Sequence, residues 1–293
     1  MRAISLFLFL AFGFSWALAY GGYRAGGFEA LGQIPTLVLM SAYMFGPAIA
    51  ALVTAFVFDR GRIADALGFK GFGAGRVIIW VLVGWLVPLL LVAGAIAASL
   101  WALHEPMADA AGAMAAQVEA TGQAMPMPAQ DLLVLQLAVG LPLGMLFNTG
   151  FLLISEELGW RGWLQPRLAG MGFWPMCLTI GVIWGLWHAP LVLMGFNYPG
   201  MGWAGVAAMT VFAILLTPYH ALARERGGVI AAAAMHGSVN AVAGLSVLFM
   251  AAPVWPWNGL LGLGGFAVLV VGLLPLWLYR SAAIKRDAKA AQA

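Results

Sequence analysis

Two adjacent carboxylates, Glu156 and Glu157, stand at the end of a long apolar run, shortly before Arg161. The chain is 63% hydrophobic and only 9% charged, and ionisable groups at membrane depth are costly and mark candidate functional sites. A helix places Glu157 and Arg161, four residues apart, on one face, where they can pair. Glu156 is turned away by roughly 100°, which leaves it free for chemistry. The alternative is a helix end that only extends its charges into the lipid headgroups.

Two histidines, His188 and His236, lie inside apolar runs further along the chain. Asn240 follows His236 by four residues, so a helix sets an imidazole beside a carboxamide, a donor pair suited to an oxyanion. Trp184 precedes His188 by one turn and should wall one side of a site against water. Pro190 should disturb the helix just after His188. A lone membrane histidine is often only an interhelical hydrogen-bonding group. Two further histidines, His104 and His220, have the character of interface or loop residues and receive no role.

Eight apolar segments come close to the roughly 20 residues that a membrane-crossing helix needs. They are residues 4–20, 34–58, 77–100, 132–154, 172–193, 203–219, 229–250 and 260–278. With a mean hydropathy of +0.95, they predict an all-α, polytopic membrane helix bundle with about eight transmembrane helices, in a single integral membrane domain over residues 1–293. The first segment also resembles a signal peptide with a cleavage site at residues 17–19, but its length and the spans that follow favour a retained helix.

The basic residues alternate with these spans in a regular way. If the N-terminus is cytoplasmic, every lysine and arginine except Arg24 falls on the cytoplasmic side. The long outer segment 101–130 carries Glu105, Asp109 and Glu119 but no basic residue. The positive-inside rule therefore predicts that both termini are cytoplasmic. The excess of positive charge then faces anionic lipid, and no nucleic-acid partner is needed to explain it. The residues on the cytoplasmic side are Arg2, Arg60, Arg62, Lys70, Arg76, Arg161, Arg167, Arg224, Arg226, Arg280, Lys285, Arg286 and Lys289.

Three local features of the sequence concern the outer segment, a pair of glycines and the cysteine. Segment 101–130 is either a short amphipathic helix on the outer surface or a disordered loop, and both remain open. Gly181 and Gly185, four residues apart, predict close helix packing. Cys177 is the only cysteine, which excludes an internal disulfide and a cysteine-based zinc cluster.

The polar side chains on or beside the fourth to seventh spans are expected to share one place. Buried separately, several would be left unsatisfied, each at a cost of kilocalories, so we expect one aqueous cavity that opens to the cytosol. A carboxylate, an imidazole and two further donors suit the hydrolysis of an amide or ester by activated water. The sequence contains no Gly-x-Ser-x-Gly elbow and no His-Glu-x-x-His. The set is Glu156, Glu157, Arg161, His188, His236 and Asn240, with Gln136 and Asn148.

Three short motifs within segment 155–241 resemble those of the CAAX protease and bacteriocin-processing family of intramembrane endopeptidases. They are Glu-Glu-x-x-x-Arg at 156–161, aromatic-x-x-x-His at 184–188 and His-x-x-x-Asn at 236–240. Each is weak alone, but their order and separation agree with the family, whose best-known member is the type II prenyl-protein protease. Trp184 stands where the family more often has phenylalanine.

The resemblance implies a role for each of these residues. Glu156 would be the general base that activates water together with His188, while His236 and Asn240 would form the oxyanion hole. The supporting residues that orient the site would be Glu157, Arg161 and Trp184. Members of the family were long described as metalloproteases, so a zinc ion held by Glu156, His188 and His236 is the alternative. Because the pair four residues apart is His–Asn, a poorer zinc anchor than two histidines, we expect catalysis without a cofactor.

The function predicted from the sequence is therefore that of an intramembrane endopeptidase acting on membrane-associated peptides of CAAX or bacteriocin type. The alternative is a transporter or non-catalytic membrane protein that uses the same polar cluster to bind an ion or a peptide. The expected partners are a membrane-associated peptide or protein substrate and the lipid bilayer. The composition, rich in alanine and glycine, favours a bacterial inner membrane as the location.

Overall fold

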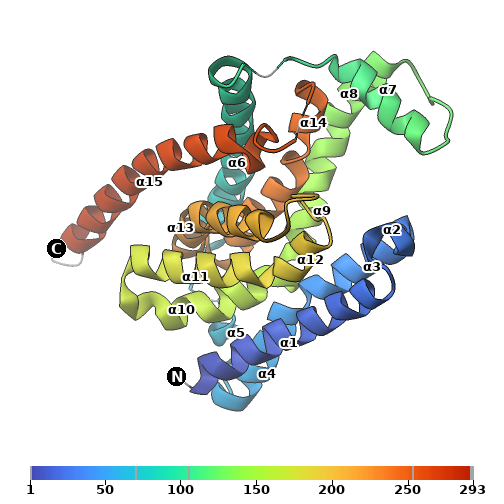
Figure 1. The fold of residues 1–293 in the computed structure, drawn as a ribbon. Coiled ribbons are helices and arrows are strands. Elements are labelled where there is room, and N and C mark those ends of the chain that lie inside the picture. Colours follow the sequence, from blue (N-terminus) through green and yellow to red (C-terminus); the bar gives the residue numbers. More distant parts are fainter. Residues whose placement is uncertain (1, 70, 105, 253, 291–293) are drawn as a thin grey trace. The chain divides into compact units, whose positions relative to one another are not determined.

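The chain is built from helices, as the sequence predicts (Figure 1). The computed structural model describes residues 2–69, 71–104, 106–252 and 254–290. No residue in these ranges belongs to a named strand, and Met107 and Met250 form an isolated antiparallel bridge. Lys70 and Glu105, which entered the charge argument, lie outside the described residues. The chain divides into two compact units, residues 1–85 with 145–238 and residues 86–144 with 239–293.

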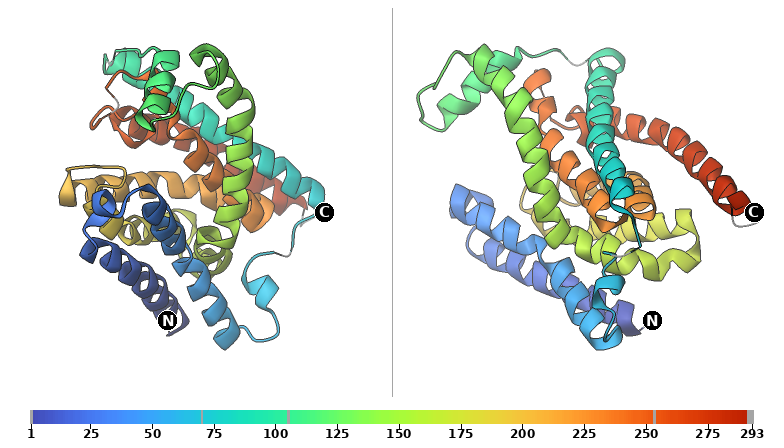
Figure 2. Two further views of the ribbon diagram at one scale, coloured as in Figure 1. Left: turned by 90° about the vertical axis from the view of Figure 1, so that its right-hand side faces the viewer. Right: turned by 180° about the vertical axis from the view of Figure 1, so that it is seen from behind.

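The first unit begins with a group of N-terminal helices. Helix α1 packs against α3, α4 and α12, and α1 and α4 lie side by side in both views of Figure 2. The approach of α4 is close at Gly46, where an added Cβ would lie 2.8 Å from the carbonyl oxygen of Ala11. The Ser15 hydroxyl donates a hydrogen bond of 2.8 Å to the Tyr43 carbonyl and ties α1 to α3. These helices are α1 (Arg2–Arg24), α2 (Gly27–Leu31), α3 (Gln33–Met44), α4 (Gly46–Phe58) and α5 (Ile63–Ala66).

The second half of the first unit holds the first two motifs and His236 of the third. Glycines bring its helices into close contact, as the sequence predicts. A Cβ added to Gly181 would lie 2.6 Å from Ile214 Cα, and one added to Gly185 would lie 2.5 Å from Thr210 Cα. The elements are α9 (Leu141–Ile154), η2 (Leu158–Leu164), α10 (Gln165–Leu168), η3 (Ala169–Met171), α11 (Phe173–Trp187), α12 (Ala189–Leu193) and α13 (Gly202–Val242).

The second unit contains the segment for which the sequence left two alternatives. Residues 110–120 of that segment form helix α7, and the Asp109 side chain caps it by accepting a hydrogen bond of 3.1 Å from the Ala111 amide. Helix α7 packs on α8 and α14 around Met114, Leu133 and Leu248. The elements are α7 (Ala110–Ala120), α8 (Ala129–Leu135), η1 (Gln136–Gly140), α14 (Leu245–Phe249), η4 (Gly259–Leu261), α15 (Leu263–Ala290) and part of α6 (Ala74–Ala102), while α9 and α13 run on into this unit.

Among the described residues, six helical stretches are long and apolar enough to cross a membrane. They confirm a polytopic membrane bundle, and the count of eight spans stays a prediction. The predicted span 172–193 corresponds to the shorter helix α11, with α12 after it. The predicted spans 203–219 and 229–250 both fall on α13, which is broken where Gly228 takes φ +80° and ψ −174°. The second of these was placed too far along the chain, because α13 ends at Val242 and α14 follows.

Candidate functional site

Glu156 is a buried carboxylate held by two indole rings. Its side chain is 3% exposed, and Oε2 accepts hydrogen bonds from Trp184 Nε1 at 2.8 Å and from Trp160 Nε1 at 3.3 Å. Burial raises the pKa of the Glu156 carboxyl, and the two indole donors act in the opposite direction. Glu156 lies between the end of α9 and the start of η2, outside the helices long enough to span a membrane. Glu157 and Arg161 are buried as well, so the alternative in which this helix end extends its charges into lipid headgroups is wrong.

Glu157 forms a second, separate polar group. Its Oε1 accepts a hydrogen bond of 2.6 Å from Arg161 Nη1, and both side chains are fully buried. The pairing predicted from their spacing is thus confirmed. The same oxygen accepts a hydrogen bond of 2.9 Å from His236 Nδ1. Glu157 therefore links the first motif to the third, across 79 residues of sequence.

The motif helix departs from the regular α-helix expected from the sequence. Residues 158–164 form a π-helix, η2, and all seven are buried. Short π-helical turns are rare and frequently mark functional sites. Gly159 and Gly162 are needed for the surrounding packing, because a Cβ at Gly159 would lie 2.6 Å from the Pro47 carbonyl oxygen and one at Gly162 would lie 2.7 Å from that of Leu67. The motif is thus enclosed by the N-terminal third of the chain.

His188 stands at a break between two helices, as the proline after it predicts. Helix α11 ends at Trp187, and α12 begins at Ala189 with Pro190 in its first turn. The ring Nδ1 lies 2.8 Å from the Trp184 carbonyl oxygen. A carbonyl only accepts, so Nδ1 carries the hydrogen and the Nε2 of the neutral ring has a free lone pair.

The backbone carbonyl of Trp187, just before His188, accepts hydrogen bonds from two residues that no sequence motif marks. The Tyr43 hydroxyl and Trp16 Nε1 both donate hydrogen bonds to the Trp187 carbonyl, the latter at 3.1 Å. Phe7 of α1 stacks on Trp163 at 4.8 Å between ring centroids. No motif marks the N-terminal helices, yet they supply contacts that fix the position of His188.

Trp184 lies at the centre of the cluster. Besides its bond to Glu156, its ring lies 5.7 Å from that of His188 and 5.0 Å from that of His236. The Arg161 guanidinium lies over its face at 4.6 Å from the ring centroid. The sequence predicted only a wall against water, whereas the indole N–H adds a hydrogen bond that a phenylalanine could not make.

His220 belongs to this cluster, which corrects the view that it is an interface or loop residue. It lies within α13, is fully buried, and its ring lies 5.2 Å from that of His236. Its Nδ1 donates to the Leu216 carbonyl at 3.0 Å, and Nε2 has no hydrogen-bond partner. Its position inside an apolar run after Pro218 was the available signal.

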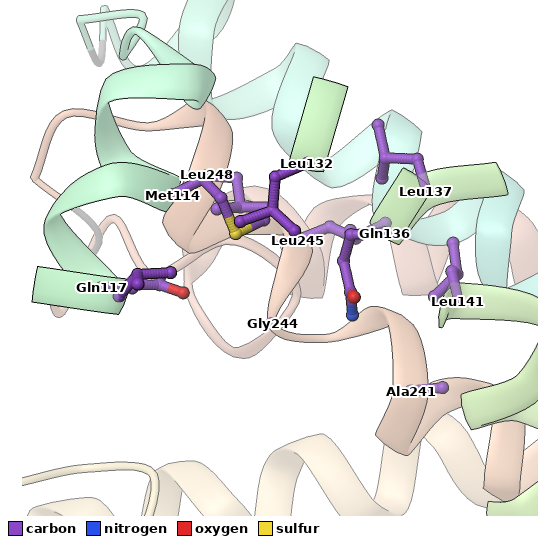
Figure 3. Close-up of a pocket in the computed structure, with 11 residues that line it drawn as sticks. Met114, Gln117, Leu132, Gln136, Leu137, Leu141, Ala241, Gly244, Leu245 and Leu248 are labelled. Carbon is purple, nitrogen blue, oxygen red and sulfur yellow. The ribbon is translucent and has the colours of Figure 1, made fainter. Parts of the chain in front are cut away.

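Asn240 follows His236 by one turn of α13, as expected, but it lies in the second unit and is exposed. A cavity with a volume of about 420 Å³ also lies in this unit. Its walls are mostly apolar, with five leucines and Met114, and Figure 3 shows the carboxamides of Gln117 and Gln136 among them. The expected aqueous cavity around Glu156, His188 and His236 is not this one, and these three side chains are only 3%, 7% and 4% exposed.

The residues that come close enough to share a metal ion differ from the predicted zinc set. One donor atom each from Glu157, His220 and His236 lies within 4.8 Å of the others. Two histidines and a carboxylate are zinc ligands by type. However, the Glu157 carboxylate is already paired with Arg161. The buried atoms without hydrogen-bond partners also include two donors, Arg161 Nε and Nη2, and not only acceptors. A dication needs acceptors and uncompensated negative charge, so these residues do not fit one.

A comparison with protein families places this cluster among known proteins. Residues 136–242 match the family model described as Type II CAAX prenyl endopeptidase Rce1-like. This segment is similar to an Rce1-like domain. The match contains all three motifs and confirms the resemblance read from them. No curated protein matches the sequence. Similarity to a membrane protease family, in a chain whose described residues include several helices long and apolar enough to cross a membrane, indicates an integral membrane protein.

Proposed function

We propose that the protein is an intramembrane endopeptidase that hydrolyses peptide bonds of membrane-associated substrates with water activated by Glu156 and His188. One observation carries the proposal, namely that both residues are bound to Trp184. Glu156 accepts from the Trp184 indole and His188 donates to its backbone carbonyl, each at 2.8 Å. A carboxylate and an imidazole with a free lone pair are thereby held beside the same residue, both removed from bulk water.

The proposed first step is attack by water on the peptide carbonyl. Both hydrogen bonds to Glu156 go to Oε2, which leaves Oε1 to accept a proton from the water, and His188 Nε2 offers a second acceptor. The proton taken by Glu156 then passes to the leaving amine as the C–N bond breaks, and the hydroxyl hydrogen of the new carboxylic acid is transferred to the same amine. The product ends are a carboxylate and a protonated amine, and no covalent intermediate is formed.

The proposed oxyanion hole uses His236 and Asn240, one helical turn apart. His236 Nδ1 is already hydrogen-bonded to Glu157, so donation to an oxyanion requires a hydrogen on Nε2 as well. The carboxylate of Glu157 is placed to stabilise a ring that carries both hydrogens. This assigns Glu157 and Arg161 supporting roles, and the step uses no metal.

The substrate proposed is a CAAX-type or bacteriocin-type peptide at the inner membrane of a bacterium, with both termini of the enzyme in the cytoplasm. Incubating the purified protein in lipid with a library of membrane-anchored peptides, followed by mass spectrometry, tests the proposal. The expected result is cleavage at defined bonds. Intact peptides throughout, together with uptake of peptide or ions into proteoliposomes, would instead support the transporter reading.

A further inference from the structure

The three motifs leave one buried group of the cluster without a role, the imidazole of His220. Its side chain is fully buried, and its Nδ1–H donates a hydrogen bond to the Leu216 carbonyl. The Nε2 of the neutral ring is therefore an acceptor, and it has no hydrogen-bond partner. A buried acceptor without a partner is costly, which points to a small ligand at this atom.

Two charged residues near His220 identify the ligand chemistry, Glu157 and Arg161. The Arg161 guanidinium and the His220 ring both lie against Trp184, at 4.6 Å and 5.5 Å from its ring centroid. Glu157 Oε2 is a second buried acceptor without a partner, while Arg161 Nε and Nη2 are buried donors without partners. The carboxylate of Glu157 and the imidazole of His220 come within 4.8 Å of each other. A cation would use only the acceptors, and an anion only the donors. Water both donates twice and accepts, and buried waters typically bind two to four such groups.

We propose that His220 is a positioning residue, and that a buried water molecule bridges its Nε2 to Glu157 Oε2 while accepting from Arg161. The water gives Glu157 Oε2 a partner of its own. Glu157 Oε1 is thereby kept on His236, to which it is bonded at 2.9 Å. This inference rests on the proposed function, because it assigns His220 to the orientation of the proposed oxyanion donor.

Two substitutions separate this role from simple packing. His220→Leu fills much of the same space without an acceptor, and His220→Gln places an amide oxygen near the position of Nε2. We expect His220→Leu to lower kcat by roughly tenfold with KM unchanged, and His220→Gln to recover most of it. His104→Gln, at an exposed position, is the control and should match the wild type. Wild-type turnover in His220→Leu, or equal losses in both His220 variants, would overturn the proposal.

A direct observation tests the water itself and does not depend on peptidase activity. A high-resolution structure should show a peak within about 3 Å of His220 Nε2, Glu157 Oε2 and an Arg161 nitrogen, and the peak should vanish in His220→Leu. Zinc titrated into the purified protein should bind no more tightly to the wild type than to His220→Leu. Absence of the peak, or a stoichiometric zinc site lost in His220→Leu, would overturn the proposal. If the wild type cleaves no peptide but the peak is present, the proposed function fails while the bridging water stands.

Discussion

The two adjacent glutamates show how strongly the surroundings change the properties of identical side chains. Glu157 is neutralised by Arg161 at 2.6 Å, whereas the hydrogen bonds to Glu156 come from two uncharged indoles. Burial therefore raises the pKa of Glu156 with no cation bonded to it. A carboxylate with a raised pKa is a stronger base, which suits the residue proposed to take a proton from water.

The Trp184 hydrogen bond to Glu156 makes this tuning testable. Trp184→Phe removes a donor that stabilises the ionised carboxylate, so the pKa of Glu156 should rise further. Because the ionised form is the active base, kcat/KM of the wild type should fall as pH drops through this raised pKa. In Trp184→Phe the fall should begin at a higher pH. A pH–rate profile on one peptide is the measurement, and an unchanged acid limb would contradict the assignment.

A substitution at Asn240 tests whether this residue acts in catalysis or in peptide binding. If it only stabilises the oxyanion, Asn240→Ala should lower kcat by about 10² to 10³ and leave peptide affinity largely unchanged. Asn258→Ala is a control at another asparagine of the second unit. Steady-state kinetics with a separate measurement of peptide binding would show the split. A large loss of affinity at unchanged kcat would refute the oxyanion role.

At the scale of elements, the N-terminal helices act as a scaffold for the motif residues. Tyr43→Phe removes one of the two donors to the Trp187 carbonyl, next to His188, and leaves Trp16 as the other. We expect a loss of about 1 kcal/mol of stability and a lower kcat. Thermal unfolding in detergent, measured beside the exposed variant Tyr20→Phe, tests this. Equal thermal unfolding midpoints for the two variants would mean that the hydrogen bond from Tyr43 does not contribute to stability.

The sequence predicts what depends on local spacing. The Glu157–Arg161 pair, the helix break before Pro190 and the packing at Gly181 and Gly185 all follow from residues within one or two turns. Prediction from the sequence fails where a contact joins distant segments of the chain. Tyr43 reaches Trp187 across 144 residues, and no local pattern encodes that bond. The π-helix at 158–164 and the buried position of His220 are likewise set by tertiary packing.

At the scale of the whole molecule, the distribution of basic residues predicts an even number of spans with both termini inside. Reporter fusions after Asp109 and Asn197 should give an external signal, and a fusion after Arg286 should give a cytoplasmic one. The reason is that lysines and arginines within short loops resist transfer across the membrane. A cytoplasmic signal from the fusion at Asp109 would contradict the topology.

One substitution tests whether Glu156 is the base of a peptidase. Glu156→Gln keeps the shape of the side chain but cannot take a proton. Turnover of a peptide that the wild type cleaves should therefore fall by about 10² to 10⁴. Glu29→Gln, at an exposed carboxylate of α2, is the matched control and should retain full activity. Cleavage by Glu156→Gln at the rate of the wild type would contradict the assignment of the active site.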